Sequence, residues 1–199
     1  MINNVVTLLP SYIENNVALS TLSGTDTSLI MAMFSVAQII FAPFNGSIKN
    51  WLGSKNTIVV GFILLTVTTV GLGLIANITD PTTFKIVACT IRFFQGQGDI
   101  MLQITGYSVI TAIYADDMMR YIGYIEICVG VGLGLGPTLA SLIMGLISSD
   151  SNVSYPYTMY VFGGFDLIAL SMCVFMIPQS LNQTISEEEI QQIEFEEDL

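Results

Sequence analysis

The 199-residue sequence contains no histidine and only five basic residues, and its charged residues amount to 11% of the chain. The absence of histidine removes the commonest zinc ligand and the side chain best suited to acid–base catalysis near neutral pH. Five lysines and arginines against sixteen acids are too few to bind a phosphate backbone. We therefore expect no metal site, no cofactor, no enzymatic activity and no nucleic-acid partner.

Cysteine is also scarce. The three cysteines, Cys89, Cys128 and Cys173, are scattered and each lies within an apolar run. An odd number of isolated thiols gives neither a disulfide framework nor a metal cluster.

Apolar residues are abundant, at 52% of the chain with a mean hydropathy of +0.70. A water-soluble fold of this size could not bury so much apolar surface. About 20 apolar residues cross a bilayer as a helix. The sequence therefore predicts an all-α integral membrane protein with five full spans, at 28–48, 57–76, 83–114, 121–147 and 157–177.

The N-terminal segment 1–13 is apolar but too short to span, and it contains Pro10. It lacks the basic residues of a signal peptide and the basic face of an interfacial helix. We interpret it as the remnant of a first spanning helix.

Basic residues at the ends of the spans set the expected orientation. Lys49, Lys55 and Arg120 fall on one side and Lys85 on the other, so the first side is predicted to be cytoplasmic. The acidic tail 179–199 lies on that side, and Ser186 followed by acids predicts a short helix there.

The third predicted span carries polar side chains whose burial at membrane depth is energetically unfavourable. Arg92, Gln95, Asp99 and Gln103 fall on one helical face. Such a seam predicts a water-filled cavity lined by a cation and a carboxylate, and the alternative is a structural Arg92–Asp99 pair between helices.

Two further acids are candidates for carrying a transported proton. Glu126 lies early in the fourth span, where an interfacial position is the alternative. Asp166 follows Gly163 and Gly164 in the fifth span, where close helix packing could bury it.

Three motifs occur in an order that resembles the major facilitator superfamily, over residues 5 to 178. Segment 91–98 resembles the fourth-helix motif, with Arg92 followed by Gln-Gly-x-Gly. Gly132, Gly136 and Pro137 match the Gly-x-x-x-Gly-Pro motif of the fifth helix. The loop motif between helices two and three is matched at Gly46, Gly53 and Lys55, but Asn50 and Trp51 replace its Asp and Arg.

The linker 114–120 and the segment 123–126 are similar to vesicular amine transporters and to their polyamine-transporting branch. The resemblance implies the amino-terminal six-helix half of a major-facilitator fold, its first helix truncated. The implied parts are the helix-one remnant 1–13, an outer or lumenal loop 14–27, helices two to six over 28–178, and the cytoplasmic tail 179–199.

The resemblance also implies a function and partners. It implies proton-coupled antiport of a small organic solute such as a cationic amine, by alternating access between two six-helix halves. The second half would be a separate chain, a second copy or a missing C-terminal part. The vesicle, endomembrane or plasma membrane is the expected location. The alternative is a structural membrane subunit derived from a transporter half, because Asn50 and Trp51 depart from the motif.

Overall fold

The computed structural model describes residues 2–148 and 150–182, with the backbone alone for residues 2–7 and 180. Its long helices are α1 (Ile2–Asn15), α2 (Gly24–Leu52), α3 (Ser54–Leu74), α4 (Pro81–Ile113), α5 (Met118–Ile147) and α6 (Ser151–Met176). Short 3₁₀ turns are η1 (Val17–Leu19), η2 (Ile75–Asn77) and η3 (Gln179–Asn182). No strand occurs in the described part of the chain, and the predicted all-α fold is confirmed. The helix expected at Ser186 lies outside the described residues.

Four described helices are long and apolar enough to cross a membrane. They are Gly24–Leu52, Ser54–Asn77, Met118–Ile147 and Ser151–Met176. The predicted span 83–114 forms α4, which is long enough but is not among these four. Its charged and amide side chains lower its hydropathy, and α4 instead packs them against neighbouring helices.

Side-chain caps define where three of the helices begin. Ser23 and Asp26 form a reciprocal capping box at the start of α2, and the Asp80 carboxylate caps α4 by accepting from the backbone N–H of Thr83. Hydrogen bonds from the hydroxyl and backbone of Thr83 hold the pKa of Asp80 below its usual value. Asp150 caps α6, so this helix starts at Ser151, before the predicted 157, and includes Pro156.

The predicted loop between the second and third family helices is instead a one-residue junction. Gly46 and Asn50 lie in the last turns of α2, and Lys55 lies in the first turn of α3. Gly53 alone joins the two helices, with a φ of 84° that favours glycine. This sharp reversal lets α2 continue past the predicted end at 48.

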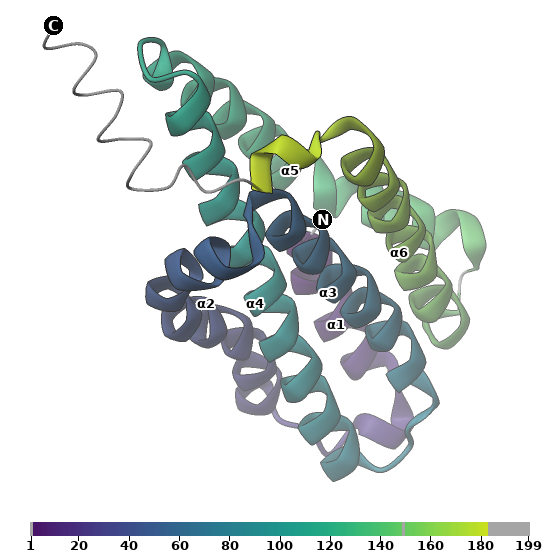
Figure 1. Ribbon diagram of the computed structural model, residues 1–199. Coiled ribbons are helices and arrows are strands. Elements are labelled where there is room, and N and C mark those ends of the chain that lie inside the picture. Colours follow the sequence, from purple (N-terminus) through teal and green to yellow (C-terminus); the bar gives the residue numbers. More distant parts are fainter. Residues whose placement is uncertain (1, 149, 183–199) are drawn as a thin grey trace, which may run out of the picture.

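The helices α2 and α4 run parallel and pack along their whole length. Cross-helix contacts join Asp26 to Lys85, Gln38 to Asp99 and Lys49 to Ser108, so the sequence offset stays nearly constant. Figure 1 shows α4 and α3 lying between α2 and α6, with α1 behind them. The polar face of α4 therefore lies inside the bundle.

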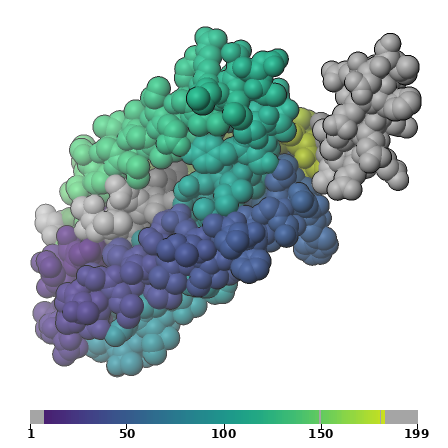
Figure 2. Space-filling view, turned by 90° about the vertical axis from the view of Figure 1, so that its left-hand side faces the viewer, coloured from purple at the N-terminus to yellow at the C-terminus, as the bar shows by residue number. Residues whose placement is uncertain are grey.

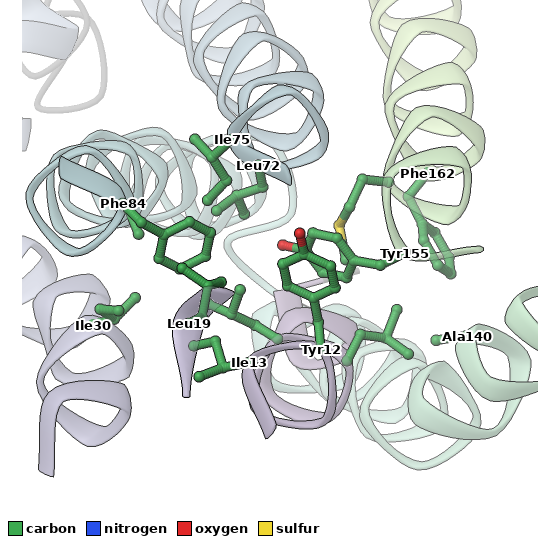
Figure 3. Packing of buried hydrophobic residues seen from close by; sticks show 14 residues of the cluster. Tyr12, Ile13, Leu19, Ile30, Leu72, Ile75, Phe84, Ala140, Tyr155 and Phe162 are labelled. Atoms are coloured by element: carbon green, nitrogen blue, oxygen red, sulfur yellow. The ribbon is translucent and has the colours of Figure 1, made fainter. Parts of the chain in front are cut away.

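An aromatic cluster holds α1 against the bundle (Figure 3). The rings of Tyr12 and Tyr155 stack with centroids 4.4 Å apart, and Tyr12 also contacts Phe84. The Tyr12 hydroxyl donates to the carbonyl of Ala76 at 3.1 Å. The segment interpreted as a helix remnant is thus a packed helix of the fold, and its reading as a remnant stays a prediction.

Candidate solute cavity and buried polar network

A cavity of about 710 Å³ lies between α2, α4 and α5. Its lining consists of Phe34, Gln38, Asp99, Gln103, Tyr124, Ile125, Cys128, Val129, Gly132 and Leu133. Helices α2 and α5, which supply two of its walls, appear on the same face of the molecule in Figure 2. The wall from α5 is mainly apolar, whereas the wall from α2 and α4 carries the polar groups.

Asp99 is the charged residue of this cavity. Gln38 from α2 donates to its Oδ2 atom at 2.7 Å, and Gln103 donates to the same oxygen at 2.6 Å. Two neutral amide donors stabilise the carboxylate without neutralising its charge. The arrangement suits a carboxylate that receives a cation from the cavity.

Arg92 lies beneath the cavity wall. Its guanidinium sits over the Phe34 ring at 4.8 Å from the centroid, and Nη1 donates to Oε1 of Gln95 at 2.6 Å. Phe34 also lines the cavity, whereas Arg92 does not. The Nε atom of Arg92 is buried and has no hydrogen-bond partner among the described residues.

The structure divides the predicted seam into two parts. Asp99 and Gln103 line the cavity, while Arg92 and Gln95 are buried outside its lining. The alternative of a direct Arg92–Asp99 pair is not observed, because within the described residues the ion pair found is Lys85–Asp26.

Asp166 is buried where α6 packs against α3, and it does not line the cavity. Its Oδ2 accepts a hydrogen bond of 3.1 Å from the Thr69 hydroxyl, which itself accepts from Nε2 of Gln95 at 3.4 Å. Gly163 lies against Val70 of α3, so a Cβ there would meet Val70 Cγ2 at 2.7 Å. This close approach accounts for the burial expected next to the glycine pair.

Glu126 lies apart from both groups. It is exposed, accepts a hydrogen bond from the Tyr107 hydroxyl and is not a lining residue of the cavity. The proton-coupling roles of Glu126 and Asp166 stay predictions.

The glycine motif of α5 is only partly packed. Gly132 lines the cavity, Gly136 is buried and Pro137 is half-buried within a continuous helix. The predicted bend at Gly136 and Pro137 stays a prediction.

Sequence reasoning missed three residues that complete the site. Gln38 and Phe34 lie in an apolar span, and Thr69 lies among the threonines of α3. An amide in an apolar run is a usable signal, because it needs a buried partner. The threonine and the phenylalanine give no comparable signal, since both are common in such helices. Among the described residues, no group of three or more histidines, cysteines or acids could hold a metal ion.

Comparison with known proteins gives consistent results. The model of the Major Facilitator Superfamily matches residues 1–195. The quinolone resistance protein NorA of Staphylococcus aureus is 24% identical over 182 residues, which are 92% of this chain and 42% of that protein. The aminotriazole resistance protein of Saccharomyces cerevisiae is 26% identical over 162 residues, covering 81% of this chain and 29% of that protein. The chain thus spans less than half the length of these curated relatives.

Proposed function

Because the chain belongs to the Major Facilitator Superfamily, a family of multi-pass membrane transporters, we propose that it takes part in secondary active transport. The proposed reaction is proton-coupled antiport of a small organic cation by alternating access. The chain would supply one wall of the central cavity, and a second six-helix half would supply the other. That half is a separate chain, a second copy or a further part of a longer protein.

The observation that carries this proposal is an amide-held carboxylate in a mainly apolar cavity. Asp99 offers negative charge, and the rings of Phe34 and Tyr124 offer cation–π contact. A volume of about 710 Å³ falls within the range of sites for drug-sized ligands. A lipophilic amine or quaternary cation would satisfy both the charge and the apolar lining.

The relatives' names support a small organic solute. One is named for resistance to quinolones and the other for resistance to aminotriazole, and both compounds are small heterocycles. Neither relative is named as an amine transporter, so the amine solute and the vesicular amine branch rest on Asp99 and on the linker 114–120.

The other candidate residues have the roles that the sequence predicts for them. Glu126 and Asp166 are the proposed proton carriers, with Gly136 and Pro137 as the bending point of α5. The junction of Gly46, Asn50, Gly53 and Lys55 is the proposed gating element. A vesicle, endomembrane or plasma membrane with a cytoplasmic C-terminal tail is the proposed location.

Binding of tetraphenylphosphonium tests the proposal, because this cation keeps its charge at every pH. The purified chain in lipid nanodiscs should bind the labelled probe, and Asp99→Asn should weaken binding about tenfold, equivalent to about 1.4 kcal/mol. Asp116→Asn is the matched control, since Asp116 is exposed in the α4–α5 connection. Absence of probe binding by the unmodified chain would favour the structural subunit instead.

Proton coupling needs a separate measurement. Proteoliposomes containing the chain together with its second six-helix half should accumulate the cation when a proton gradient is imposed, and Glu126→Gln or Asp166→Asn should abolish this accumulation. If both variants keep full gradient-driven uptake, neither acid carries the proton.

A further inference from the structure

Two buried residues outside the cavity lining carry polar atoms that make no hydrogen bond within the described part of the chain. Asn45 on α2 and Thr105 on α4 are both 0% exposed. The atoms without a partner are Oδ1 and Nδ2 of Asn45 and Oγ1 of Thr105. Burial of an unpaired polar group is strongly unfavourable, and nearly all buried polar groups in folded proteins are hydrogen-bonded. These three atoms therefore need a partner.

The side chain of Asn45 faces α4. Asn45 lies seven residues after Gln38 and four before Lys49, so all three side chains share one face of α2. Gln38 donates to Asp99 of α4, and Lys49 donates to Ser108 of α4. Asn45 therefore points toward the part of α4 between these two contacts.

Thr105 belongs to this part of α4, where α2, α3 and α4 meet. It follows Gly98 by seven residues, so both lie on one face of α4. That face packs against α3, because a Cβ on Gly98 would lie 3.0 Å from the carbonyl oxygen of Gly61. Thr105 follows Asn45 by 60 residues, and the two neighbouring α2–α4 contacts join residues 61 and 59 apart. Asn45 and Thr105 thus lie at one level of the bundle.

A direct bond between Asn45 and Thr105 would leave one of the three atoms unpaired. The Thr105 hydroxyl can donate to Oδ1, which leaves Nδ2 without an acceptor, or it can accept from Nδ2, which leaves Oδ1 without a donor. Turning the amide over exchanges Oδ1 and Nδ2 and gives the same result. The amides of Asn15 and Asn56 donate to the carbonyl four residues earlier in the chain, but Asn45 makes no such bond among the described residues. A further group is required, and it must both donate and accept.

We propose that Asn45 and Thr105 bind internal water at the meeting point of α2, α3 and α4. Water accepts a hydrogen bond from Nδ2 and donates to Oδ1, and a buried water typically makes about three hydrogen bonds to such atoms. A metal cation cannot accept from Nδ2, and a simple anion cannot donate to Oδ1. The water site is separate from the solute cavity and does not depend on the proposed function.

Radiolytic labelling tests the water site in the unmodified chain. A millisecond X-ray pulse converts bound water to hydroxyl radicals, which oxidise the side chains next to it. Met101 lies one turn before Thr105 and is 2% exposed, whereas Met159 is 1% exposed and belongs to the apolar cluster around Tyr12. In lipid nanodiscs, Met101 should be oxidised several-fold faster than Met159, as measured by mass spectrometry of the peptides. Equal oxidation of these two equally buried methionines would overturn the proposal.

Substitution at the site assigns the labelling to the two polar side chains. The double variant Asn45→Leu, Thr105→Val removes all three polar atoms and should abolish the difference in oxidation between the two methionines. Thr68→Val is the matched control, because Thr68 is also buried but its hydroxyl bonds to backbone carbonyls of its own helix. The control should keep the difference. A difference that survives in the double variant would contradict the assignment.

Thermal unfolding provides a second readout, in which the sign of the effect is informative. If Asn45 and Thr105 bind a common water, Asn45→Leu and Thr105→Val should each lower the unfolding midpoint by a few degrees. The double variant should lower it by less than the two losses combined, because both side chains act through the same water. If the polar atoms are instead unpaired, each substitution removes an unfavourable buried group and should raise the midpoint.

Three results of the unfolding measurement would count against the water site. Raised midpoints would show that the polar atoms have no partner, and additive losses would show that the two residues act separately. A midpoint that rises with sodium concentration, together with slow oxidation of Met101, would indicate a cation in place of water.

Discussion

Two glycines of α4 and three glycines of α5 have opposite surroundings. In α4, a Cβ on Gly96 would lie 2.2 Å from the Phe34 carbonyl oxygen, and one on Gly98 would lie 3.0 Å from that of Gly61. In α5, a Cβ on Gly130, Gly132 or Gly134 would meet no atom within 4 Å. The same residue type therefore brings backbones together in one helix and leaves a smooth, unfilled face in the other.

This difference indicates that the glycines of α4 serve helix packing, whereas those of α5 leave a helix face free to contact another molecule. The polar face of α4 is enclosed by α2 and α3, and its side chains find partners there. The face of α5 borders the cavity and carries many exposed apolar side chains. Substitutions at the packed glycines of α4 should therefore affect stability, and those on the cavity-lining face of α5 should affect binding.

Gly96→Ala is expected to have the largest effect. The added methyl group overlaps a backbone carbonyl that cannot rotate away, so α2 and α4 must separate at a cost of about 3 kcal/mol. A thermal unfolding scan of the purified protein should show a much lower midpoint, and Gly134→Ala should show none of this loss. Equal midpoints for the two variants would remove the contrast between the helices.

Gln95→Leu should have the second-largest effect on stability. It deprives Arg92 of an acceptor and Thr69 of a donor, and leaving buried polar groups unpaired costs about 2 kcal/mol. Gln97→Leu, half-buried on another face of α4, is the control. Denaturant unfolding measures the two stabilities. A Gln95→Leu protein as stable as the control would show that the hydrogen bonds of Gln95 to Arg92 and Thr69 contribute nothing to stability.

Gly132→Leu should change binding without changing stability. The new side chain would occupy part of the cavity, and tetraphenylphosphonium affinity should fall about tenfold, or about 1.4 kcal/mol. Gly134→Leu lies outside the cavity lining and should leave affinity unchanged. Binding of radiolabelled tetraphenylphosphonium measures both affinities. A destabilised Gly132→Leu protein would instead indicate that this face of α5 is packed.

Lys85→Met should have the smallest effect. The ion pair of Lys85 with Asp26 joins α2 and α4 at 2.5 Å, but both side chains are partly exposed. Surface pairs contribute little and are screened by salt. The unfolding midpoint should drop slightly at low salt and not at all at high salt, and a loss that persists at high salt would reveal a role beyond charge pairing.

Hydropathy and helical periodicity predicted much of this structure. Runs of apolar residues located the long helices. The spacing of the polar residues predicted one face of a helix, and on that face Arg92, Gln95 and Asp99 are buried while Gln103 is exposed. Periodicity describes a single helix, however. It could not reveal that Gln38 lies opposite Asp99, because that contact depends on the register between α2 and α4.

The same limit applies to the buried network and the helix junction. Thr69 is one of four buried threonines in α3, and only its position opposite α4 and α6 distinguishes it from Thr57, Thr66 and Thr68. The extension of α2 to Leu52 depends on the positive φ of Gly53. A sequence shows that glycine can adopt this conformation, but not that it does.

The parallel pairing of α2 with α4 has a consequence for biosynthesis. As the chain is made, α2 and α3 enter the membrane before α4, the helix whose charged residues make it the least suited to lipid. Its partners Gln38, Phe34 and Thr69 are then already in place. Because of this order, Arg92 and Asp99 can pass from the insertion machinery directly into contact with their protein partners. A permuted chain in which α4 is made first should insert poorly.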